Sequence, residues 1–142
     1  MNAELRSLHR GALQRRARQR VDLFDDMRAV KIARGHGLAQ REIADLLVTS
    51  QDIVHRLLKA VERRGGDLTP DPAELIMRAF AYDSPRGALL NQLKAYPYDF
   101  GKNAPSPYEG RLPGTWDQIV VAFAQEMLSR EEFDELKNAV GR

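Results

Sequence analysis

Residues 40–59 read QREIADLLVTSQDIVHRLLK and are the most informative part of the first half of the chain. Its apolar residues keep helical spacing in two short blocks, one on each side of a turn at 48–50. Two short helices joined by so tight a turn pack against each other at a steep angle. The stretch therefore predicts a helix-turn-helix whose second helix runs from Gln51.

Residues 38–59 resemble, without a gap, the helix-turn-helix of bacterial transcription regulators. The likeness is carried by the run QREIA at 40–44 and by the run VHRLLK at 54–59. The resemblance implies sequence-specific binding to double-stranded DNA, with a recognition helix at about 50–62 in the major groove. It also implies a regulator of transcription, either an activator or a repressor, and we take a repressor as the working expectation.

The turn departs from the family pattern. Members usually carry a glycine there, because glycine tolerates a left-handed backbone, and then an aliphatic residue. Val48 and Thr49 stand in these places. Since a β-branched residue is poorly suited to positive φ, we expect either a turn of different construction or a strained backbone.

The predicted DNA-contacting residues follow from helical geometry. On a helix from Gln51, the side chains at 52, 55, 56 and 59 share one face, and the apolar ones lie on the other. Ser50 is the expected N-cap, and Gln40 and Arg41 are expected to hold the DNA backbone from the preceding helix. The full set is Gln40, Arg41, Ser50, Gln51, Asp52, His55, Arg56 and Lys59.

Each of these side chains suggests a particular contact. Gln51 can pair with adenine through two hydrogen bonds, and Arg56 can either read guanine or hold a phosphate. Asp52 would repel phosphate, so it should accept from a cytosine amino group or pair with Arg56 four residues on. His55 either meets a base or remains a solvated helix residue.

Composition fits one globular domain of ordinary size, or a small domain with an accessory part. The chain has 142 residues, 43% hydrophobic and 30% charged, with a net charge of +2. Residues 1–64 hold 14 Lys/Arg against 8 Asp/Glu, whereas residues 65–142 hold 8 against 12. We therefore expect a basic helical region at 1–64 that contains the helix-turn-helix, and an acidic helical accessory module at 70–142.

Six arginines crowd a predicted helix at 2–20, which precedes a supporting helix at 21–34. One reading is an arm that contacts phosphates. The alternatives are a solvated helix face and a helix used for homodimerisation. The arm would consist of Arg15, Arg16, Arg18 and Arg20.

The second half predicts more helices and one long irregular loop, so the fold class is all-α. Strong start signals lie at Asp71, Thr115 and Ser129, and prolines and glycines fill 96–114. This half is similar to the C-terminal part of small uncharacterised actinobacterial helix-turn-helix proteins. The similarity lies in YPY at 96–98, PGTWD at 113–117 and LSREEF at 128–133, and it implies a recurrent module without indicating its ligand.

Aromatic residues gather around the irregular loop. They either line a pocket or a site for a partner peptide, or they fasten the loop over a small core. The residues concerned are Tyr96, Tyr98, Phe100, Tyr108 and Trp116.

Catalytic chemistry has little basis in this sequence. There are no cysteines, and the three histidines, His9, His36 and His55, stand in unrelated contexts without metal-ligand spacing. No phosphate-binding glycine loop and no apolar run long enough to cross a membrane is present. We therefore expect no enzyme, no catalytic residue, no metal, no cofactor and no membrane contact, and a cytoplasmic, nucleoid-associated protein.

Two functional hypotheses follow. The first is a bacterial DNA-binding transcription regulator. The second is an antitoxin-like interaction protein whose C-terminal half binds a protein partner and whose helix-turn-helix regulates its own operon. Both share the DNA-binding half, and co-purification with a neighbouring gene product would separate them.

Overall fold

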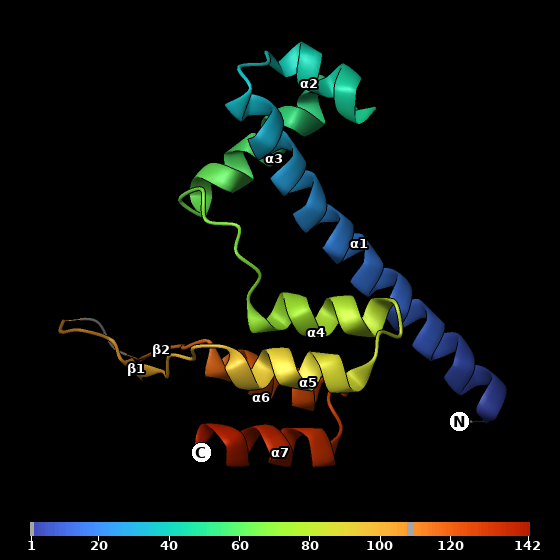
Figure 1. The fold of residues 1–142 in the computed structure, drawn as a ribbon, viewed down its shortest axis with the longest axis vertical. Helices are drawn as coiled ribbons and strands as arrows, with labels where there is room; N and C mark the ends of the chain where they lie inside the picture. The colour runs from blue at the N-terminus through green and yellow to red at the C-terminus, as the bar shows by residue number, and fades with distance from the viewer. Residues whose placement is uncertain (1, 108–109) are drawn as a thin grey trace. The chain divides into compact units, whose positions relative to one another are not determined.

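The computed structural model describes residues 2–107 and 110–142, and within them helices make up nearly all regular structure. The predicted all-α class is confirmed. One small antiparallel strand pair, β1 (Lys102–Asn103) with β2 (Arg111–Leu112), lies in the segment that was expected to be irregular. The helices are α1 (Ala3–Gly35), α2 (Gln40–Leu47), α3 (Gln51–Arg63), α4 (Pro72–Ala81), α5 (Arg86–Ala95), α6 (Trp116–Ala124) and α7 (Arg130–Val140) (Figure 1).

Helix α1 is one continuous helix of 33 residues, where the sequence predicted two. Gly11 costs about 1 kcal/mol of helix propensity, but no proline interrupts the segment, so the helix propagates through it. It ends where predicted. Gly37 has φ 83°, and the N–H groups of Gly37 and Leu38 bond back to Arg34 and Ala33.

The chain forms two compact units. The helix-turn-helix unit spans Gln19–Thr69 and contains the second part of α1 with α2 and α3. The second unit is discontinuous in sequence, because it combines the chain up to Arg18 with Pro70–Arg142. Helix α1 therefore contributes residues to both units.

The helix-turn-helix unit has a core of apolar side chains at helical spacing, and residues 65–69 are fastened to it. The guanidinium of Arg28 donates to the Leu68 carbonyl at 3.1 and 2.8 Å, and Lys31 donates to the Gly66 carbonyl. The segment between the two predicted regions, 1–64 and 70–142, is thus held against α1. The buried residues are Val21, Phe24, Met27, Val30, Ala33, Ile43, Ala44, Val54, Leu57, Val61 and Leu68.

In the second unit, α4 packs against α5 and α6, and α7 packs against α5 and α6 (Figure 1). One acidic side chain is buried in it: Glu74 is 2% exposed and forms an ion pair of 3.1 Å with Arg78, four residues on. The core consists of Ile76, Ala79, Leu89, Leu93, Trp116, Ile119, Ala122, Leu128 and Leu136.

The first part of α1 caps the C-terminal end of α4. Gln14 and Arg18 donate to the carbonyls of Phe80 and Ala81 at 3.1 and 3.0 Å, which are among the carbonyls that α4 leaves without a helical partner. Arg10 forms an ion pair of 3.1 Å with Asp83. Hydrogen bonds from Gln14 and Arg10 hold the pKa of Asp83 below its ordinary value.

The three helix starts predicted in this half are confirmed, because α4, α6 and α7 begin directly after Asp71, Thr115 and Ser129. The carboxylate of Asp71 accepts from the Glu74 N–H, and Ser129 forms the expected capping box with Glu132. Only the side-chain cap expected at Thr115 is wrong: the backbone of Thr115 is already helical, and its hydroxyl accepts from the Asp99 N–H at 2.9 Å. Among the described residues, no helix combines the length and the apolar character that crossing a membrane requires.

Candidate nucleic-acid interface

Helices α2 and α3 form the helix-turn-helix, joined by residues 48–50. Glu42 accepts from the Ala39 N–H at 3.0 Å and so closes the start of α2. Ser50 is the N-cap of α3, as predicted, because its hydroxyl accepts from the Ile53 N–H at 3.2 Å. Ala44 is buried, and so small a side chain permits a close crossing of the two helices.

The turn keeps the left-handed geometry that glycine usually supplies, although a valine stands there. Val48 has φ 58° and ψ 51°, and its side chain is 91% exposed. The turn closes through the Thr49 N–H, which donates to the Ala44 carbonyl at 3.0 Å. The left-handed backbone is unfavourable for valine, and burial of the side chain does not offset this cost. The expectation of a strained backbone is therefore the one that the structure confirms.

Helix α3 separates its side chains by character as the sequence predicted. Val54, Leu57 and Val61 are buried, and Leu58 is half-buried. The other face is polar and open to solvent. It carries Gln51, Asp52, His55, Arg56 and Lys59, all of them exposed.

Few of these polar side chains are engaged within the protein. Gln40 at the start of α2 lies 3.5 Å from Nδ1 of His55, which brings the two predicted contact residues together. Lys59 pairs with Glu62 at 3.5 Å. Of the two contacts suggested for Asp52, the pair with Arg56 is not formed, and among the described residues the Arg56 guanidinium has no ion-pair partner.

The arginines of the proposed arm have separate surroundings. Arg18 is committed to the Ala81 carbonyl, and Arg20 lies over the ring of Phe24 with 5.3 Å between guanidinium carbon and ring centre. Arg15 and Arg16 are exposed. Arg15, Arg16 and Arg18 belong to the second unit, and Arg20 belongs to the helix-turn-helix unit.

The compact units divide the charges differently from the sequence halves. Residues 19–69 hold 9 Lys/Arg and 8 Asp/Glu, and the residues of the second unit hold 13 and 12. The arginines at 6–18 are in the same unit as the acidic C-terminal half, where Arg10 pairs with Asp83. A basic first half that opposes an acidic second half is therefore a property of the sequence that the folded units do not keep.

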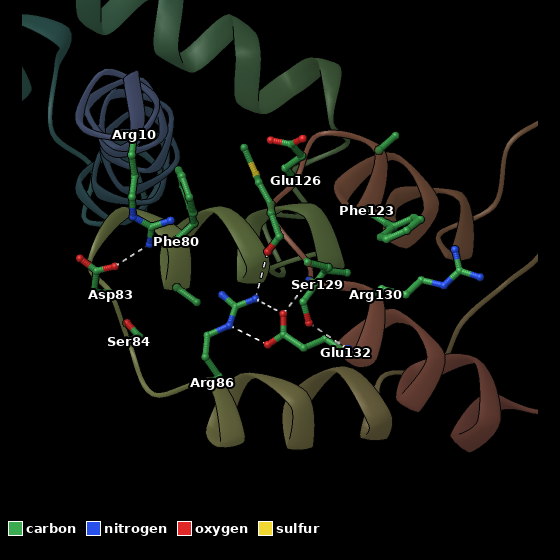
Figure 2. A pocket seen from close by; sticks show the side chains of 14 residues that line it. Arg10, Phe80, Asp83, Ser84, Arg86, Phe123, Glu126, Ser129, Arg130 and Glu132 are labelled. Carbon is green, nitrogen blue, oxygen red and sulfur yellow. Dashed lines mark hydrogen bonds and ion pairs between the residues drawn. The ribbon is translucent and has the colours of Figure 1, made fainter. Parts of the chain in front are cut away.

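A hollow of about 740 Å³ in the second unit is lined by three arginines and three acidic residues (Figure 2). Arg86 donates to both carboxylate oxygens of Glu132, at 2.8 and 2.7 Å, and to the Met127 carbonyl. Arg10 pairs with Asp83 at the opposite wall, as Figure 2 shows. The hydrogen bonds from Arg86 hold the pKa of Glu132 low, and Glu132 raises the pKa of Arg86. These arginines serve the fold, since carboxylates of the same unit already neutralise them.

The aromatic residues around the loop are packed into the second unit. Tyr98 meets Trp116 edge to face at 5.2 Å, and its hydroxyl donates to the Leu93 carbonyl at 2.7 Å. Burial, together with neighbouring Tyr96, raises the pKa of Tyr98 to about 12. Phe100 also contacts Trp116, at 6.5 Å. The rings fasten the loop to the core, and Tyr108 lies outside the described residues.

Sequence reasoning missed the contacts that join two of the motifs. The Asp99 carboxylate accepts from the Thr115 N–H at 2.6 Å, and the Asp99 carbonyl accepts from the Trp116 N–H at 3.1 Å. The Tyr-Pro-Tyr and Pro-Gly-Thr-Trp-Asp segments thus meet in space. Their shared aromatic and turn-forming character was the only available signal.

Comparisons with protein families, with curated proteins and with solved structures found no match for this chain.

Proposed function

We propose that this protein is a sequence-specific, DNA-binding transcription regulator that reads the major groove with α3. The observation that carries the proposal is the separation of α3 into a buried apolar face and an open polar face, directly after α2 and a tight turn. A recognition helix needs this arrangement, since its core face fixes its position and its polar face must reach base edges.

The contacts expected in such a complex follow from donors and acceptors. Gln51 stands at the start of α3, where recognition helices meet the bases, and its amide can both accept and donate at adenine. Arg56 offers a guanidinium that no carboxylate of the described residues occupies, and it suits guanine or a phosphate. Arg41 and Lys59 are exposed cations beside this surface and suit phosphates.

The nearly neutral charge of the helix-turn-helix unit sets an expectation for affinity. Nonspecific binding depends on cations that displace counterions from phosphates. With 9 Lys/Arg against 8 Asp/Glu, this unit should bind random DNA weakly and should depend on base contacts for its tighter sites.

The same proposal places the protein in the cytoplasm, on chromosomal DNA, as a repressor. A homodimer on two half-sites one helical turn apart is the arrangement that fits recognition by a single short helix per chain.

Two steps test the central statement. Fragments of genomic DNA that the protein retains are sequenced to define a site, and affinity is then measured for that site and for scrambled DNA. Arg56→Ala should weaken binding to the site by about 1–3 kcal/mol if Arg56 reads a base, and should weaken both DNAs alike if it holds a phosphate.

The matched control is Arg130→Ala, which removes the same charge from an exposed position of the second unit. It should leave both affinities unchanged. If no fragment is enriched, or if the two variants behave alike, the proposal is wrong.

A further inference from the structure

A second cavity in the second unit, of about 450 Å³, lies beside α4 and α6 and has the size of a small-molecule site. Its apolar lining comes mainly from Ile76 and Met77 of α4, from Val121 and Ala122 of α6, and from Met127. Val121 is 51% exposed although it lies in this concave surface. Methionine side chains adapt to varied apolar shapes, so the lining can fit closely around a guest.

One edge of the cavity is polar and held in place by the contacts between the two motifs. Besides the bonds of Asp99 to residues 115 and 116, the Gly114 N–H donates to the Asp117 carboxylate at 2.7 Å. A Cβ at Gly114 would lie 2.5 Å from the Asp99 carbonyl oxygen, so the segments touch without any intervening side chain. This edge is therefore preorganised.

The charge of the lining selects the ligand. Asp99 and Asp117 both line the cavity, and the described lining residues include no Lys, Arg or His. One oxygen of Asp99 accepts from the Thr115 N–H, while the other has no hydrogen-bond partner within the described residues. The hollow of Figure 2 differs in this respect, because Arg10 and Arg86 line it and pair there with Asp83 and Glu132.

We propose that this cavity binds a small amphipathic cation, an organic amine whose apolar body lies between α4 and α6 and whose ammonium group pairs with Asp99. An apolar lining stabilises the body of such a molecule, and a fixed carboxylate at the edge favours a positive head group over a neutral or negative one. The site is independent of the DNA-binding proposal.

The test uses the full-length protein and three probes with one apolar body: 4-phenylbutylamine, 4-phenylbutanol and 4-phenylbutyrate. The methyl signals of the four methionines report the location of binding, because Met77 and Met127 line the cavity and Met27 lies in the other unit. The amine should shift the signals of Met77 and Met127 saturably and leave that of Met27 in place. The alcohol should bind more weakly, and the carboxylate weakest.

Two variants identify the head-group and body contacts. Asp99→Asn keeps an oxygen for the Thr115 N–H and should weaken the amine by up to about fivefold while leaving the alcohol unchanged. Val121→Phe should fill the cavity and weaken amine and alcohol together, with folding checked by thermal melting. Glu131→Gln, an exposed charge change on α7, should change nothing.

The proposal is overturned if no probe shifts the Met77 and Met127 signals. It is equally overturned if the alcohol or the carboxylate binds as tightly as the amine, or if Asp99→Asn affects amine and alcohol alike.

Discussion

Val48 is the residue at which local backbone preference and the observed conformation disagree most. Its left-handed φ of 58° costs a non-glycine residue about 1–2 kcal/mol, and its side chain is too exposed to recover this through packing. Val48→Gly should therefore raise the free energy of unfolding, by about 0.5–1 kcal/mol after the entropy that glycine adds to the unfolded chain. Chemical denaturation measures the change.

Val48→Ala is the control for this prediction. Alanine removes the branch but keeps the Cβ that makes positive φ unfavourable, so it should stabilise less than glycine does. A destabilised Val48→Gly protein would show that the valine side chain contributes contacts which its exposure does not suggest.

Glu132 gives a prediction for pH at the same scale. Its pKa is held low, chiefly by the hydrogen bonds from Arg86 and against the opposing effect of burial. A carboxylate with a lowered folded pKa stabilises the protein above the pKa of the unfolded chain, and this contribution disappears as the pH falls through the folded pKa. Between about pH 6 and about pH 3, the melting temperature of Glu132→Gln should therefore fall by less than that of wild type.

Glu131→Gln, at the neighbouring exposed position, should keep the wild-type dependence on pH. Equal slopes for wild type and Glu132→Gln would mean that the ion pair with Arg86 does not persist in solution.

At the scale of elements, the junction before α6 leaves no space at Gly114. Since a Cβ there would lie within 2.5–2.6 Å of the backbone of Asp99 and Phe100, Gly114→Ala should destabilise the protein by about 1–3 kcal/mol. Gly87→Ala is the control: apart from its chain neighbours and the adjacent backbone of α5, no atom of the described residues lies within 4 Å of its Cβ position, so it should be neutral or stabilising by up to about 1 kcal/mol. Thermal and denaturant unfolding measure the stability of both variants. Equal changes in stability for Gly114→Ala and Gly87→Ala would contradict the tight packing at Gly114.

The sequence predicted helices and their caps correctly where the interactions that fix them are local. The helices on either side of residues 48–50, and the caps at Ser50, Asp71 and Ser129, depend on side chains within four residues, and the structure confirms them. The cap predicted at Thr115 failed because its hydroxyl bonds to Asp99, sixteen residues away.

Long-range contacts explain the other differences between prediction and structure. Arg86 and Glu132 are 46 residues apart, and Arg18 and Ala81 are 63 apart. No period or spacing in the sequence indicates such pairs. The polar face of α3 could be predicted residue by residue, whereas the cavity beside α4 and α6 could not, since residues from three separate stretches of the chain line it, at 73–77, 99 and 113–127.

For the whole molecule, the division of charge between the units leads to a prediction about salt. If the arginines of α1 contact phosphates, binding to DNA should fall with salt by a log–log slope of about −0.9 per phosphate neutralised. Replacing Arg15 and Arg16 together by Ala should then reduce the magnitude of that slope by about 1 per arginine. Arg18 is left intact because it holds the Ala81 carbonyl.

A double variant of Lys102 and Arg130 to Ala serves as the charge-matched control, and its slope should equal that of wild type. An unchanged slope for the arginine pair would remove the phosphate-contacting arm. Sedimentation of the same variant would then show whether this part of α1 acts in dimerisation.

The discontinuous second unit has a consequence for the exchange of domains between genes by recombination. Because α1 supplies residues to both units, no single break in the gene separates two intact halves: a cut after Thr69 leaves the segment from Pro70 onward without the side chains that cap α4. An N-terminal DNA-binding domain that is contiguous in sequence and ends in a linker can be exchanged between genes by one crossover. Here an exchange that keeps both units whole needs two crossovers, one on each side of the stretch from Gln19 to Thr69.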